Sequence, residues 1–72
     1  MAEPREIKII GDYIALGQFL KLARIIDSGG AAKAFLAETL VLINGEADER
    51  RGRKLREGDE ILILGKSYRI TR

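Results

Sequence analysis

The aliphatic run of residues 40–43, followed at once by Asn44-Gly45, is the feature that most constrains how this chain folds. Asn-Gly readily supplies the two positive φ angles of a type I′ turn, so the run predicts a β-strand that leads into a tight hairpin. The return strand is expected to begin at Glu46. The second half of the chain is therefore expected to be antiparallel sheet.

Three more segments are expected to be strands. Residues 61–64 and 67–70 are predicted to pair through a two-residue connection at Gly65-Lys66, and Gly58 is predicted to occupy a left-handed position in the turn before them. Near the start of the chain, residues 5–10 alternate polar and apolar side chains, which is typical of a short, half-buried strand.

Two short helices are predicted between the first strand and the hairpin. Residues 14–24 carry apolar side chains at helical spacing, with Asp12 as the expected cap. The second helix is expected to follow Ser28-Gly29-Gly30, with Ser28 as its N-cap. The predicted buried stripes are Leu16, Phe19, Leu20 and Ala23 on the first helix, and Ala32, Phe35 and Leu36 on the second.

These elements predict the fold class. We expect an α+β protein with a single domain over residues 1–72, in which two short helices pack against a small, strongly bent antiparallel sheet of four to five strands. Neither helix is long enough to be stable alone, so each must pack on the other and on the sheet.

Composition excludes much of enzyme chemistry. The chain has 72 residues, with no cysteine and no histidine, so it has no thiol nucleophile, no Ser-His pair and no Cys/His zinc site. Its carboxylate pairs, Asp48-Glu49 and Asp59-Glu60, are adjacent in sequence and on strands would point to opposite faces. We expect no catalysis, no cofactor and no metal.

The aliphatic runs are too short to span a bilayer, and residues 1–4 have neither the basic start nor the apolar stretch of a signal peptide. We therefore expect a cytoplasmic protein that makes no membrane contact and acts as a monomer.

The net charge of +2, from 13 Lys/Arg and 11 Asp/Glu, conceals a cluster of cations. Five basic residues fall between Arg50 and Arg56, flanked on both sides by acidic residues. Most of them are arginines, whose planar fork suits bidentate binding of phosphate. This stretch is a candidate nucleic-acid contact.

Two further features favour an anionic partner. On the outer side of the first helix, Gln18, Lys21 and Arg24 follow at intervals of three and form a drifting polar row. At the second helix, Gly29-Gly30 leaves room for a phosphate to approach the N-terminus, with Lys33 one turn inside.

Residues 14–63 resemble the αL RNA-binding motif, the domain named after ribosomal protein S4 of the small subunit, and the chain is most similar to its small stand-alone bacterial members. The matching segments are Leu16-Gly17-Gln18-Phe19-Leu20-Lys21, Ser28-Gly29-Gly30-Ala31-Ala32-Lys33, Val41-Leu42-Ile43-Asn44-Gly45 and Gly58-Asp59-Glu60-Ile61.

The resemblance implies binding to structured RNA, either ribosomal RNA or tRNA, and to the ribosome or an assembly intermediate. The contacts that it implies are Gln18, Lys21, Ser28, Gly29, Lys33, Arg50, Arg51, Arg53 and Lys54, beside the Arg24 and Gly30 already singled out. Many members have Arg where this chain has Gly29, which puts one RNA contact in doubt. Many also have Gly in place of Thr39, so the second helix is expected to end differently here.

Structured RNA is favoured over duplex DNA because neither helix is long or polar enough on its outer face to read a major groove. Two other readings stay open. A ubiquitin-like sulfur carrier also fits the hairpin and the closing turn, but it needs a C-terminal Gly-Gly, and residues 68–72 contain none. An adaptor that binds proteins through an exposed sheet edge is the third reading.

Overall fold

The computed structural model describes residues 4–72; residues 1–3, part of the segment from which no signal peptide is expected, lie outside them. The elements are β1 (Arg5–Lys8), β2 (Ile14–Ala15), α1 (Leu16–Leu22), a 3₁₀ turn (Gly29–Ala31), α2 (Ala32–Glu38), β3 (Val41–Ile43), β4 (Glu46–Ala47), β5 (Lys54–Leu55), β6 (Glu60–Ile63) and β7 (Lys66–Thr71). Within the described residues, neither helix reaches the length or hydrophobicity of a membrane span.

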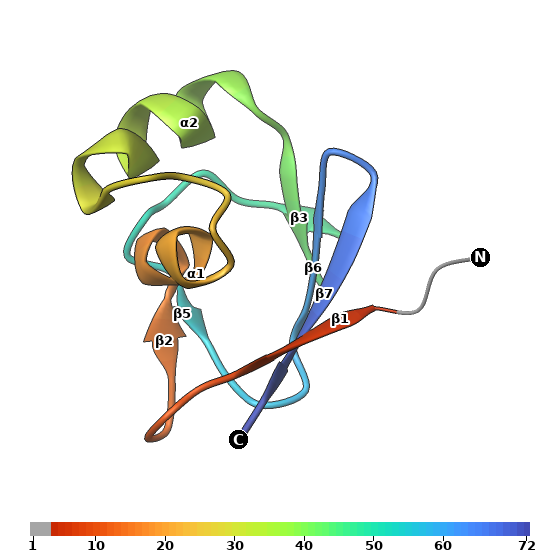
Figure 1. Cartoon of the computed structure of the whole chain (residues 1–72). Helices are drawn as coiled ribbons and strands as arrows, with labels where there is room; N and C mark the ends of the chain where they lie inside the picture. Colours follow the sequence, from red (N-terminus) through yellow and green to blue (C-terminus); the bar gives the residue numbers. More distant parts are fainter. Residues whose placement is uncertain (1–3) are drawn as a thin grey trace.

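Five strands form one sheet in the order β1-β7-β6-β3-β4, and β2 pairs separately with β5. Both helices lie to one side of the larger sheet (Figure 1). The predicted α+β class is confirmed, but the sheet is mixed, because β1 pairs in parallel with β7 while the other neighbours are antiparallel. Parallel neighbours need a long crossover connection, and here nearly the whole chain supplies it.

The predicted hairpin turn is confirmed, since Asn44 and Gly45 have φ angles of 52° and 86°. Asn44 also ties this turn to the one before β6. Its side-chain amide donates to Asp59 Oδ1 at 3.1 Å, and its side-chain oxygen accepts from the Glu60 amide at 3.0 Å. Gly58, with φ 91°, has the left-handed conformation that the sequence predicts.

The connection between β6 and β7 differs from the prediction. It consists of Leu64 and Gly65, with φ angles of 53° and 77°, and Lys66 already belongs to β7. Buried Ile63 pairs with Lys66, and this register keeps alternate side chains of β6 in the core. Core burial thus places the turn one residue earlier, even though Leu64 must adopt a left-handed conformation that glycine or asparagine would adopt more readily.

Helix α1 begins later than expected. Ile14 and Ala15 are extended and pair with β5, so the helix starts at Leu16, and Asp12 is not its cap. Gln18 caps the start of the helix instead, because its side-chain oxygen accepts a hydrogen bond from the Ala15 amide at 3.3 Å. Strand pairing with a distant segment has overridden the helical pattern at residues 14–15.

The second helix also begins later than its sequence signal. Gly29–Ala31 form a 3₁₀ turn, and Ser28 precedes this turn without making a side-chain capping hydrogen bond. Helix α2 starts at Ala32. The helix ends at Glu38, and Thr39, which follows it, is extended, with φ −126° and ψ 130°. The expected ending without a left-handed residue is therefore confirmed.

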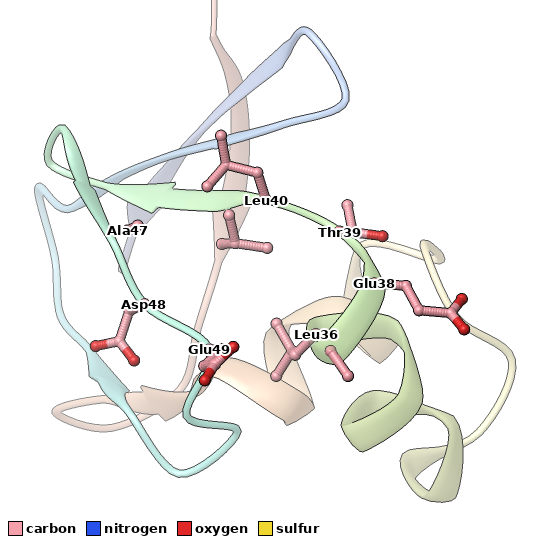
Figure 2. A pocket seen from close by; sticks show the side chains of 9 residues that line it. Leu36, Glu38, Thr39, Leu40, Ala47, Asp48 and Glu49 are labelled. Carbon is pink, nitrogen blue, oxygen red and sulfur yellow. The ribbon is translucent and has the colours of Figure 1, made fainter.

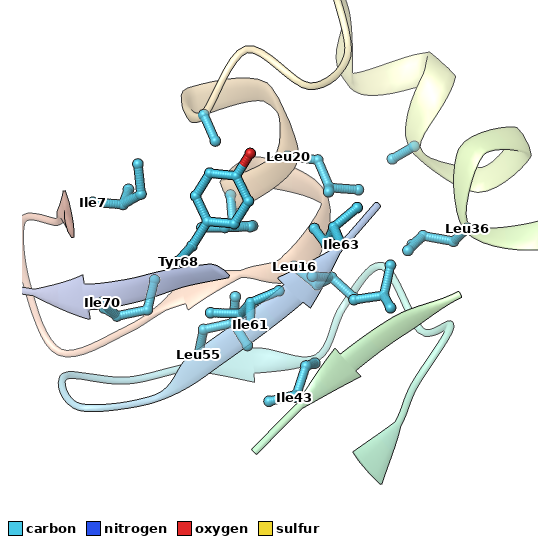
Figure 3. Packing of buried hydrophobic residues seen from close by; sticks show 14 of the residues in the cluster. Ile7, Leu16, Leu20, Leu36, Ile43, Leu55, Ile61, Ile63, Tyr68 and Ile70 are labelled. Carbon is cyan, nitrogen blue, oxygen red and sulfur yellow. The ribbon is translucent and has the colours of Figure 1, made fainter. Parts of the chain in front are cut away.

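The core lies between the helices and the larger sheet (Figure 3). The predicted stripe of α1 is buried, and Phe19 meets Tyr68 of β7 edge to face, with the ring centroids 5.5 Å apart. On α2, Ala32 and Leu36 are buried, while Phe35 is only partly so. This packing fixes α1 on the sheet and leaves its outer side to solvent.

Candidate nucleic-acid interface

The arginine loop, residues 50–53, belongs to the connection between β4 and β5 (residues 48–53) and is hydrogen-bonded to the start of α1 through the backbone. The Leu16 amide donates to the Arg53 carbonyl at 2.7 Å, and the Gly17 amide donates to the Arg51 carbonyl at 2.8 Å. The first turn of a helix has amides without partners inside the helix, and the loop carbonyls satisfy two of them here. The loop is therefore held against α1.

Gly17 allows this close approach. A Cβ at this position would lie 3.4 Å from the Cβ of Ala32, 3.4 Å from the Cβ of Arg51 and 3.4 Å from the Arg51 carbonyl oxygen. Any side chain larger than a methyl group would separate α1 from the loop or from α2. In the sequence, Gly17 is a residue that weakens a helix. In the structure, it is the position at which α1, α2 and the arginine loop approach one another closely.

Around this meeting point lies a surface depression, which we call the α1 hollow. Its lining residues are Gly17, Gln18, Lys21, Gly29, Ala32 and Arg51. Ala32 comes from the start of α2, and the others come from α1, the glycine turn and the arginine loop, which are the three features that the sequence predicts to share one partner. Within the part of the chain that the structure describes, no carboxylate belongs to this lining.

Two of the predicted phosphate ligands are engaged within the protein. Arg50 donates to Asp48 through its guanidinium Nε at 3.1 Å and Nη2 at 2.8 Å, and through its backbone amide at 2.9 Å. Arg53 adds a fourth hydrogen bond to the same carboxylate through Nη1, at 3.2 Å. The carboxylate of Asp48 thus accepts hydrogen bonds from two arginines, and these bonds order the loop.

These contacts shift the protonation equilibria. The hydrogen bonds from the Arg50 side chain and backbone, its positive charge and the bond from Arg53 hold the pKa of Asp48 well below its ordinary value. The same carboxylate raises the pKa of Arg50. The Arg50 side chain nevertheless remains 72% exposed, so it is accessible to a ligand while it is paired.

Lys54 begins β5 and stands beside an aromatic ring. Its Nζ lies 5.0 Å from the ring centroid of Tyr13, and the guanidinium carbon of Arg56 lies 5.9 Å from the same centroid. Both distances are within the range of cation–π attraction. Lys54 and Arg56 also line a second depression on the loop, together with Arg50, Gly52, Arg53 and the carboxylate Asp59.

Arg24 does not continue the helical row of Gln18 and Lys21. Its φ is 60°, its amide donates to the Lys21 carbonyl at 3.0 Å, and the next amide, of Ile25, donates to the Leu20 carbonyl at 2.9 Å. This is a Schellman ending with arginine in the left-handed position. The predicted row is therefore wrong at its last member, although Arg24 still lines a groove that Gln18 and Lys21 also line.

The remaining predicted contacts are not part of the α1 hollow. Ser28, Gly30 and Lys33 are exposed, but none of them belongs to its lining. Because a 3₁₀ turn precedes α2, the glycines do not lie at the N-terminus of that helix, and only Gly29 reaches the hollow.

An acidic hollow of different chemistry lies between the end of α2 and strand β4 (Figure 2). Glu38, Asp48 and Glu49 line it together with apolar residues, and no lysine or arginine does so. Glu38, Asp48 and Glu49 therefore line a depression separate from the α1 hollow, although Asp48 also accepts hydrogen bonds from Arg50 and Arg53 of the arginine loop. This depression does not suit RNA.

Sequence reasoning missed three participants. Asp48 reads as one of several acidic neighbours, yet it is the carboxylate that orders the loop. Arg56 belongs to the basic run but is not among the contacts that the resemblance implies, and its approach to the ring of Tyr13, which is far from it in sequence, has no local signal. The spacing of Asp48 and Arg50, in which a carboxylate accepts the amide two residues on, is a local signal that identifies the first of these.

Comparison with known proteins defines the class. A family model described as the S4 domain matches residues 7–71, so this chain belongs to the S4 domain family, as the sequence pattern indicates. The match gives no support to the sulfur-carrier reading. A more specific relative is the "Probable ribosome maturation protein RlbA" of Bacillus subtilis (strain 168), which is 58% identical over 65 residues that cover 90% of this chain and 89% of the relative. No solved structure gives a significant match.

Proposed function

We propose that this protein binds structured RNA of the ribosome or of an assembling ribosomal particle, mainly through phosphate contacts at the α1 hollow and the arginine loop. The observation that carries the proposal is the convergence of Lys21, Gly29 and Arg51 on one depression free of carboxylates. A partner with a regular array of phosphates matches such a surface.

Membership of the S4 domain family and the name of the Bacillus subtilis relative support a role in ribosome maturation. In this proposal the protein acts in the cytoplasm as a monomer, and by binding rather than by catalysis. In this proposal shape and phosphate spacing determine recognition, because Gln18 is the one uncharged polar side chain that residues 4–72 contribute to the lining of the hollow, and its oxygen already accepts from the Ala15 amide.

The contacts divide into two sets. Lys21 and Arg51 meet a phosphate in the α1 hollow. Arg50, Arg53 and Lys54 extend the path along the loop, where Asp48 holds the two arginines in fixed orientations. Such pre-orientation reduces the entropy lost on binding.

The test is binding of ribosomal RNA fragments across a salt series. About five phosphate contacts give a slope of log affinity against log salt of roughly −3 to −5. Arg51→Glu is expected to weaken binding and to make the slope of log affinity against log salt shallower by about 0.7–0.9 or more, which is the contribution of one phosphate contact. Lys66→Glu is the matched control, because it makes the same charge change at the start of β7, outside the lining of the hollow and the loop.

A salt-independent affinity, or equal loss in the two variants, would contradict the proposal. Co-sedimentation with ribosomal particles that survives nuclease treatment but not charge reversal would instead favour the adaptor reading.

A further inference from the structure

A groove beside the α1 hollow has a lining of mixed character. It runs between the end of β1 and the outer side of α1, and its volume is about 720 Å³. Sites that hold small ligands span roughly 300–1,000 Å³. Gln18 and Lys21 line both this groove and the α1 hollow, so the two depressions are neighbours.

The groove exposes an apolar surface that the fold itself does not need. Ile10 is 98% exposed, Leu22 is 49% exposed although it lies on α1, and Tyr13 is 47% exposed. A single exposed apolar residue is ordinary, but three that line one groove indicate a binding surface.

The charged residues of the same groove all have one sign. Lys8, Lys21 and Arg24 line it, and no carboxylate among residues 4–72 does. Tyr13 connects it to the loop, because Lys54 and Arg56 stand against its ring. A ligand that combines an apolar part with negative charge close to it therefore matches this lining.

We propose that this groove holds one unpaired nucleotide of the RNA, and the inference rests on the function proposed above. The base packs against Ile10, Leu22 and the Tyr13 ring, and the flanking phosphates bind Lys8, Lys21 and Arg24. A base within a duplex is stacked on both faces and cannot enter, whereas a splayed base can. The groove thus selects RNA that carries a bulged or looped-out nucleotide next to a helical part.

Charge complementarity favours a nucleotide over an apolar peptide as the occupant. Three cations without a carboxylate would repel basic segments and leave the lysines of the groove unpaired against an aliphatic one. Continuity with the α1 hollow through Gln18 and Lys21 places the groove where the same RNA strand continues.

The test compares a blunt-ended RNA duplex with the same duplex carrying a single bulged nucleotide. The wild-type protein is expected to bind the bulged duplex about tenfold more tightly, because stacking or packing of one base contributes about this factor. The double variant Ile10→Gln, Leu22→Gln should bring the ratio of affinities close to one and leave the affinity for the blunt duplex unchanged. Leu40→Gln, at a residue 67% exposed and outside the groove, should keep the ratio.

Arg51→Glu separates this inference from the proposed function, because it should weaken both duplexes and preserve their ratio. A photoreactive thiouridine at the bulge should crosslink to the peptide that contains Tyr13. Equal binding of the two duplexes by the wild-type protein, or a ratio that the double variant does not change, would overturn the nucleotide site. If the double variant lost only its co-sedimentation with ribosomal particles, the occupant would be a protein. Failure to bind either duplex would refute both this inference and the proposed function.

Discussion

Replacing Asp48 with Asn removes the charge that Arg50 and Arg53 share. The carboxylate accepts four hydrogen bonds of 2.8, 2.9, 3.1 and 3.2 Å, and its side chain is only 9% exposed. Hydrogen bonds to a charged group contribute about 1.5–3 kcal/mol when they are shielded, but Arg50 is mostly in solvent, which screens the pair. We therefore expect Asp48→Asn to lower the free energy of unfolding by about 1–2 kcal/mol at neutral pH.

This contribution depends on pH in a definite direction. In the folded protein the pKa of Asp48 lies well below its ordinary value, whereas in the unfolded chain an aspartate titrates near about 3.9. Above the unfolded value the folded state therefore gains the full stabilisation, and the gain is lost as the pH falls toward the folded value. The difference in stability between wild type and Asp48→Asn should be largest at neutral pH and should shrink in acid.

Urea unfolding followed by circular dichroism at about pH 7 and about pH 3 measures this difference. Asp12→Asn is the matched control, since Asp12 is 86% exposed and lies 3.6 Å from Arg72. Its effect should be within about 0.5 kcal/mol. A stability difference for Asp48→Asn that stays the same in acid, or that is no larger than that of the control, would refute the role given to this carboxylate.

Two glycines give further predictions. Gly17→Val should lower the free energy of unfolding by about 1–3 kcal/mol, because the branched side chain would push Arg51 and Ala32 away. Gly17→Ala should be within about 1 kcal/mol of wild type, and urea unfolding of both variants measures the difference. Gly29→Arg should strengthen RNA binding and make the salt slope steeper by about 0.7–0.9, since a Cβ there meets no atom within 4 Å and the residue lines the α1 hollow. An unchanged slope for Gly29→Arg would show that position 29 does not face the RNA.

Local signals in the sequence predicted much of the fold. Asn44-Gly45 predicted its turn because the positive φ angles depend on those two residues alone. The stripe of α1 predicted its buried face because helical spacing fixes which side chains share a side. Thr39 predicted the extended exit from α2 for a similarly local reason.

Long-range contacts determined what the sequence did not predict. Ile14 and Ala15 have a helical pattern but pair with β5, and the parallel pairing of β1 with β7 joins opposite ends of the chain. In the candidate interface, the sequence predicted Lys21 and Arg51 to share one surface, and they do. Arg24 follows a helical interval in the sequence, but the Schellman ending removes it from the helix.

Asp48 both lowers the net charge of the chain and fixes the orientation of two arginines of the candidate interface. A carboxylate two residues before a run of arginines lowers the net charge, yet here it orients Arg50 and Arg53 and leaves Arg50 exposed. Unpaired arginines in a mobile loop would attract any polyanion, and they would lose more side-chain entropy on binding. In the proposed function, a fixed pair near the α1 hollow instead presents charges at set positions, so that affinity would depend on the spacing of the phosphates. A net charge of only +2 is thus compatible with RNA binding.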